Sequence, residues 1–216
     1  GNNIDRQAEG QAKAWSPWAW NPIQVGDNAY NRAQILESWQ KGNQTYVKCI
    51  PMQWDMNGMP AQATMEQWTT IKGNVIKVRN RLVCSRTDDL YGEGVVCSQE
   101  IPAVYVISAL KNLYSYFGDK PFSNQPIKST EVKQLILNDP EHFWGLYRDA
   151  SEQWMAFVDD SNWGLAVYSP TAEAFLAGRF DSFLEGDEHH VACSYIAPIR
   201  QEALKKDSVM EYEYYL

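Results

Sequence analysis

The chain has 216 residues, carries a formal net charge of −8 at pH 7, and is 44% hydrophobic. These values predict a folded chain with a substantial core and exclude disorder as its main state. The acidic balance, without a cluster of Lys and Arg, argues against nucleic acid or an anionic membrane surface as a partner. No apolar run is long enough to span a bilayer, and we find no signal-peptide pattern.

The aromatic content is unusual, with nine tryptophans and twelve tyrosines. One core of this size does not need so many rings, so we expect some of them on the surface, where flat faces bind sugars or partner proteins. An acidic chain rich in tryptophan predicts a secreted or periplasmic protein. Gly1 followed by two asparagines is typical of a trimmed or mature amino terminus.

The four cysteines are not spaced as a CxxC motif, which argues against a zinc ribbon or a thioredoxin-type site. A disulfide between Cys84 and Cys97 and a set of buried free thiols are equally good interpretations. The cysteines are Cys49, Cys84, Cys97 and Cys193.

The first segment with a functional pattern runs from Ile4 to Asp27 and combines tryptophans with prolines and polar residues. Proline on both sides of the cluster favours a rigid extended segment. Sugar rings stack on aromatic faces, and amide and carboxylate groups bond their hydroxyls. This segment therefore predicts a carbohydrate site, whereas the alternative is that the rings close one end of a sandwich. The candidate sugar contacts are Trp18, Trp20, Asn21 and Gln24, and Asp27 is a candidate for acid or base chemistry.

Two β-hairpins are predicted next, one over residues 33–50 with a Lys-Gly-Asn turn at 41–43, and one over residues 63–83 with the same turn at 72–74. In the last strand Lys77, Arg79 and Arg81 point away from the apolar side chains. This basic row is either a solvated face paired with Glu66 or a cleft for an anion or a uronic acid, in which Arg79 would bind substrate.

Glu100 stands directly before an apolar run and near a proline. A carboxyl group fixed at the start of a buried strand is a candidate general acid or base, because desolvation raises its pKa. Tyr105, in the same stretch, is a candidate substrate contact. The alternative is a loop carboxylate that caps backbone amides or pairs with an arginine.

Residues 108–117 fit both a helix and a strand, and the clearest hairpin of the chain follows at residues 152–170, where Asp159 to Asn162 form the turn. Both of its faces carry apolar groups, so we expect it to lie between two layers. An acidic loop at 184–190 presents His189 and His190 as further acid/base candidates, although such a loop is usually solvated and we expect no metal there. Closing strands are expected at residues 192–199 and 210–216.

Together these elements predict an all-β fold: one antiparallel two-sheet β-sandwich domain over residues 1–216, supersandwich-like or jelly-roll-like, with few short helices. The segments WNPIQVGD, QEIPAVY, EQWMAFVDDSNWGLAVYSP and CSYIAPI resemble those of secreted bacterial carbohydrate-active β-sandwich proteins, in particular the galactose mutarotase-like supersandwich group. The resemblance implies a concave sheet that faces a sugar. The motifs of the aldose epimerases themselves are absent, so no residue role is transferred from them.

Two functions compete, and a third, a structural or partner-binding sandwich, explains the acidic surface but not the tryptophan-rich segment. The first is a sugar-processing enzyme acting on an oligosaccharide or polysaccharide, such as a glycoside hydrolase, a lyase or an epimerase-like protein, in which Glu100 works with Asp27 or a histidine. The second is a binding module without catalysis. Both expect a carbohydrate ligand and no cofactor, and neither fixes the glycan or the oligomeric state.

Overall fold

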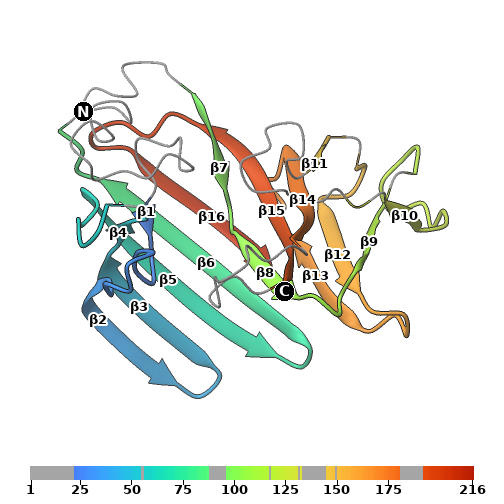
Figure 1. Cartoon of the computed structure of the whole chain (residues 1–216), viewed down its shortest axis with the longest axis horizontal. Helices are drawn as coiled ribbons and strands as arrows, with labels where there is room; N and C mark the ends of the chain where they lie inside the picture. Colours follow the sequence, from blue (N-terminus) through green and yellow to red (C-terminus); the bar gives the residue numbers. More distant parts are fainter. Residues whose placement is uncertain are drawn as a thin grey trace. The chain divides into compact units, whose positions relative to one another are not determined.

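The computed structural model describes residues 22–54, 56–87, 96–116, 118–130, 132, 145–148, 150–180 and 192–216. These residues are all-β, with antiparallel sheets and no helix among them, so the predicted fold class is confirmed (Figure 1). The strands are β1 (Pro22–Ile23), β2 (Gln34–Lys41), β3 (Gln44–Ile50), β4 (Met52–Gln53), β5 (Ala63–Lys72), β6 (Val75–Cys84), β7 (Cys97–Glu100), β8 (Val104–Ile107), β9 (Asn112–Ser115), β10 (Lys128–Thr130), β11 (Gly145–Tyr147), β12 (Trp154–Val158), β13 (Gly164–Tyr168), β14 (Ala174–Phe180), β15 (Cys193–Glu202) and β16 (Val209–Tyr215).

The chain divides into two compact units. The first falls within Gly1–Cys97 and Glu202–Tyr212, and the second within Ser98–Gln201 and Glu213–Leu216. Strand β16 contributes residues to both. The expectation of a single domain over residues 1–216 stays a prediction.

The first unit is built on the two predicted hairpins. Its strand order is β16-β6-β5-β3-β2, with β2 paired to β3 and β5 paired to β6 across two-residue turns. The turns contain Gly42 and Gly73, whose φ angles of 57° and 59° suit a residue without a Cβ atom. Alternating side chains and Lys-Gly-Asn turns therefore specify both hairpins locally.

One face of this sheet is core and the other is polar. Ala33, Cys49 and Met52 form a buried cluster with Met65 packed against it, and Val78 and Leu82 are also buried. The side chains of alternate positions point to the opposite face, which carries aromatic and charged groups.

The second unit contains two packed sheets. The strand order β10-β9-β12-β13-β16 makes one sheet, and β11-β14-β15-β7 makes the other, with β8 also paired to β15. A buried cluster between them takes side chains from both sheets, and this packing is a β-sandwich. Its members are Leu110, Leu113, Met155, Phe157, Val167, Phe175, Ala177 and Ile196.

The hairpin predicted at residues 152–170 is formed by β12 and β13, but it is not covered equally on both faces. Met155 and Phe157 point into the sandwich and are fully buried, whereas Ala166 and Tyr168 on the other face are exposed. The apolar side chains on the second face are small or carry a polar tip, which a solvated sheet face tolerates. The ambiguous segment at 108–117 forms strand β9, and the closing strands are β15 and β16.

Candidate functional site

The outer face of the β7-β15-β8 arrangement brings Glu100 together with two tyrosines. Strand β8 pairs with β15 so that Tyr105 lies opposite Tyr195, and the two ring centroids are 4.7 Å apart. Glu100 ends strand β7, which pairs with the same edge of β15 as β8 does, and its carboxyl group shares a hydrogen bond with the Tyr195 hydroxyl. Two sequence-predicted residues, Glu100 and Tyr105, are thus joined by a third that the sequence did not single out.

The environment of Glu100 favours its protonated form. Desolvation raises the pKa of the carboxyl group, and the hydrogen bond from Tyr195 opposes this shift without cancelling it. The residue as a whole is nevertheless exposed. Glu100 is therefore an exposed residue whose carboxyl group lies in a desolvated environment.

The two tyrosines differ in access. Tyr195 is 1% exposed, and desolvation together with the charge of Glu100 raises its pKa well above 10, so the hydroxyl stays a hydrogen-bond donor. Tyr105 is 62% exposed and Ile107, two residues along the same strand, is 64% exposed. An open ring beside a carboxyl group of raised pKa is an arrangement that can hold a sugar and exchange a proton with it.

Asp27 has a different role in the structure. Its carboxylate accepts hydrogen bonds from the backbone amides of Ala29, Asn31 and Gly58 at 3.0, 2.9 and 2.6 Å, and from the Asn31 side-chain amide. Desolvation opposes ionisation, but these hydrogen bonds outweigh it and lower the pKa of Asp27. Gly26 is needed beside it because a Cβ atom there would collide with the Asn31 carbonyl. Asp27 is an ionised carboxylate that organises a loop.

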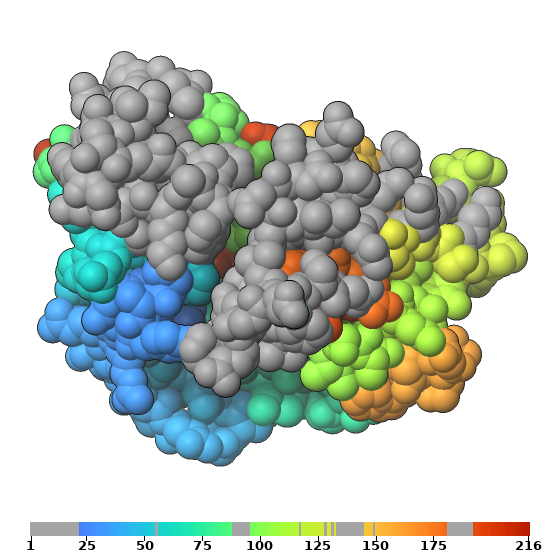
Figure 2. Space-filling model, viewed as in Figure 1, coloured from blue at the N-terminus to red at the C-terminus, as the bar shows by residue number. Residues whose placement is uncertain are grey.

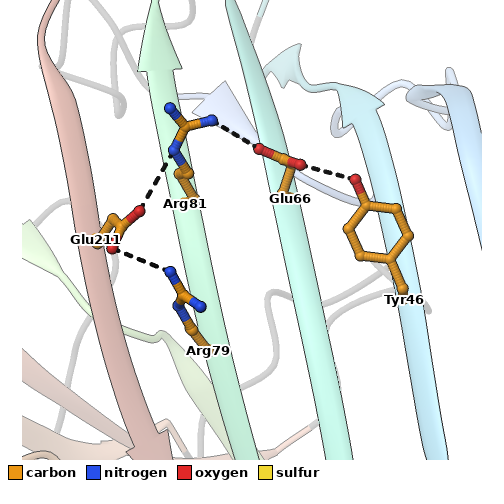
Figure 3. Close-up of polar contacts among 5 residues, drawn as sticks. All are labelled: Tyr46, Glu66, Arg79, Arg81 and Glu211. Atoms are coloured by element: carbon orange, nitrogen blue, oxygen red, sulfur yellow. Dashed lines mark hydrogen bonds and ion pairs between the residues drawn. The ribbon is translucent and has the colours of Figure 1, made fainter.

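Arg79 lies in a polar network on the open face of the first unit (Figure 3). Arg79 contacts Glu211 at 3.2 Å, Arg81 contacts both Glu211 and Glu66, and Glu66 accepts a hydrogen bond from the Tyr46 hydroxyl at 2.7 Å. The predicted pairing with Glu66 is therefore confirmed for Arg81, whereas Arg79 pairs with Glu211. Because carboxylates already neutralise these guanidinium groups, the arrangement fits a solvated face better than a cleft for an anion.

The remaining candidates divide into two groups. Gln24 is half-buried, and its backbone carbonyl lies 3.7 Å from the Cys49 thiol. Trp18, Trp20, Asn21, His189 and His190 lie outside the described residues. Within the described ranges, no cluster of His, Cys, Asp and Glu has metal-ligand geometry, all four cysteines are free thiols, and no helix could cross a membrane.

No family model and no curated protein matches this sequence. The fold is similar to that of a putative aldose 1-epimerase from Escherichia coli K12, with 9% identity, a TM-score of 0.51, and coverage of 95% of this chain and 78% of that protein. The HI1317 protein gives 12% identity and a TM-score of 0.45, and this chain spans 65% of its length. The GH36 α-galactosidase AgaB from Geobacillus stearothermophilus gives 10% identity and a TM-score of 0.47, with 94% of this chain and 31% of that chain covered.

At these identities the likeness shows the fold alone. The supersandwich-like fold that the sequence predicted therefore has support in the first of these structures, which is named for sugar chemistry.

Proposed function

We propose that this is a secreted or periplasmic sugar-processing enzyme in which Glu100 transfers a proton to or from a sugar held against Tyr105. The observation that carries the proposal is the position of Glu100, an exposed residue whose carboxyl group hydrogen-bonds the Tyr195 hydroxyl and has a pKa raised by desolvation. A general acid or base works best when its pKa lies near the working pH, and the raised pKa moves Glu100 in that direction.

The cluster favours proton transfer over hydrolysis by two carboxylates. Glycoside hydrolysis normally uses a pair of carboxyl groups on opposite sides of the scissile bond. Among the described residues around Tyr195 and Tyr105, Glu100 is the carboxyl group that affects their pKa values. We therefore favour an epimerase-like or lyase-like reaction, with His189 and His190 as candidates for the second proton-transfer group. Asp27 is not proposed as the second proton-transfer group, because its carboxylate accepts hydrogen bonds from the Ala29, Asn31 and Gly58 backbone amides.

The test compares Glu100→Gln with Tyr105→Ala on oligosaccharides and polysaccharides from plant, host and microbial sources. Each reaction is followed by reducing-end release, by absorbance of an unsaturated product, and by NMR exchange of sugar protons. Glu100→Gln should abolish turnover but retain glycan binding, because the amide keeps the shape of the side chain and cannot transfer a proton. Tyr105→Ala should weaken binding. If Glu100→Gln turns over glycan at the wild-type rate, the assignment is wrong.

A binding module without catalysis is the second candidate, favoured by the exposed ring of Tyr105 beside the exposed Ile107. It predicts that Tyr105→Ala weakens glycan binding while no glycan in the panel is altered by the wild-type protein. Trp18→Ala and Trp20→Ala test whether the amino-terminal tryptophans contribute to either function.

A further inference from the structure

The last strand of the first unit's sheet, β2, has one edge with no pairing partner among the described residues. Its other edge pairs with β3 (Figure 1). Seven of its eight residues are exposed, including Ile35 and Leu36 at 56% and 45%. Atoms of this segment, in blue, lie at the molecular surface (Figure 2). An edge strand of this length, with unpaired backbone groups, is a template for pairing with another strand.

The turn that follows β2 determines which backbone groups point outward. Lys41 and Gln44 flank a two-residue turn and are paired in register, and Trp39 pairs with Tyr46. Hydrogen-bonded residues alternate along an antiparallel pair, so Lys41 and Trp39 direct their amide and carbonyl groups toward β3. Ser38 and Gln40 therefore direct theirs to the free edge.

We propose that the free edge of β2 pairs antiparallel with β2 of a second copy of this chain, about a two-fold axis at Trp39. This register places Ser38 opposite Gln40 of the second copy, so that the outward amide and carbonyl groups meet. It also places Glu37 opposite Lys41 of the second copy, and by symmetry this charge pair occurs twice. A β-bulge between Ile35 and Glu37 limits regular pairing to the five residues from Glu37 to Lys41.

The charges select this register over its neighbours. An axis at Ser38 would place Glu37 opposite Trp39, and an axis at Gln40 would place it opposite Asn43. Only the axis at Trp39 sets each acidic side chain against a basic one, and opposite charges directly across a strand pair are favourable whereas like charges are not. The side chains of Glu37, Trp39 and Lys41 share one face of the strand because successive side chains alternate.

The aromatic side chains continue across the proposed axis. In one copy, Trp39 stacks on Tyr46 with centroids 5.5 Å apart, and Tyr46 contacts Trp68 at 5.1 Å. The Lys41 Nζ atom lies 5.4 Å from the centroid of Trp39, which confirms that both side chains lie on this face. Two-fold pairing brings the two Trp39 side chains side by side and joins both ring rows. Five residues a side bury less area than a standard interface, so we expect a weak dimer.

Charge reversal in the full chain, measured by sedimentation velocity over a concentration series, tests the proposal. Glu37→Lys and Lys41→Glu each place like charges opposite one another at both pairs and should weaken dimerisation by about ten- to hundredfold. The double variant Glu37→Lys/Lys41→Glu restores complementarity and should dimerise like wild type. An equimolar mixture of the two single variants should form a heterodimer although neither forms a homodimer.

A disulfide trap provides an independent readout of register. Residues opposite one another at a non-hydrogen-bonded position have Cα atoms about 4.5 Å apart, within the range of a disulfide. Glu37→Cys/Lys41→Cys should give a covalent dimer on a non-reducing gel, since positions 37 and 41 are too far apart along one strand to bridge within a chain. Glu37→Cys alone is the matched control and should stay monomeric.

A wild-type chain that is monomeric up to about 1 mM would overturn the proposal. So would a dimer that Glu37→Lys leaves intact, or a double charge variant that fails to recover dimerisation. A Glu37→Cys variant that cross-links as well as the double cysteine variant would show the wrong register. None of these outcomes depends on the proposed sugar chemistry.

Discussion

Replacing Asp27 by Ala separates a structural carboxylate from a catalytic one. The carboxylate accepts hydrogen bonds from three backbone amides and one side-chain amide, and Asp27 is 6% exposed. Buried hydrogen bonds to a charged group contribute about 1.5–3 kcal/mol each, but Ala29 and Gly58 are exposed, so water can replace part of the loss. At about 1 kcal/mol for each backbone amide, the free energy of unfolding should fall by about 3 kcal/mol.

For a chain of this size that loss corresponds to a Tm lowered by about 6–12 °C, measurable by calorimetry. The matched control is Asp159→Ala. Asp159 also accepts hydrogen bonds from two backbone amides, those of Ser161 and Trp163, but it lies in an exposed turn. Its replacement should therefore lower the free energy of unfolding much less. Because the pKa of Asp27 is lowered from 3.8, its contribution is present above that value and is lost as the pH falls through the lowered pKa. A Tm unchanged by Asp27→Ala would refute this reasoning, and loss of turnover at unchanged Tm would return Asp27 to the catalytic candidates.

Three further predictions follow from burial and charge. Phe157→Ala should destabilise the second unit by about 3–5 kcal/mol in urea unfolding, because Phe157 is 0% exposed in the sandwich core. Trp163 is 66% exposed, so Trp163→Ala should change the stability by about 0.5 kcal/mol or less. Equal effects of the two variants would contradict the burial of Phe157 in the core. At Glu66, hydrogen bonds from Tyr46 and Arg81 and the charges of Lys48 and Arg81 outweigh desolvation, so the pKa of Glu66 is lowered. The stability that Glu66 contributes is therefore lost as the pH falls from 4.5 through that lowered pKa. Glu66→Gln should flatten the fall of stability in this acidic range, and an unchanged fall would exclude the Glu66 network as its cause. Desolvation raises the pKa of Cys84 to about 11, so at pH 8 a thiol reagent should modify the partly exposed Cys97 and Cys193 before Cys84, as read by peptide mass spectrometry, and early labelling of Cys84 in the folded protein would be the opposite result.

The hairpins were predictable because their signals are local. Alternation over ten residues and a Lys-Gly-Asn turn specify β5 and β6, whose observed bounds differ from the predicted ones by about one residue. The segment at 108–117 was ambiguous because Leu110 and Leu113 have helical spacing. It forms β9 because pairing with β12 places Leu113 in the sandwich core, and that pairing is not visible in the segment itself.

The candidate site depended on contacts between distant parts of the chain. Glu100 and Tyr105 are close in sequence and were both nominated, but the residue that connects them is Tyr195. The strand that contains Tyr195 was predicted, but its pairing with β8 was not, because the register of β15 against β8 is set by tertiary packing. A tyrosine in a strand rich in apolar residues was the local signal.

Glu100 and Asp27 show why the type of residue did not decide its role. Both are carboxyl groups next to aromatic segments, and both were nominated for acid/base chemistry. Asp27 meets three donors from its own loop and the Gly58 amide from a second segment, and these stabilise the ionised form. Glu100 has the Tyr195 hydroxyl as a donor, but desolvation outweighs it and favours the neutral form. Removing the Tyr195 hydroxyl should therefore have a defined effect: in Tyr195→Phe the pKa of Glu100 should rise further, because that hydroxyl no longer opposes the desolvation. Carboxyl NMR titration of Glu100 measures this directly, and a pKa that falls in Tyr195→Phe would remove the physical basis for assigning proton transfer to Glu100.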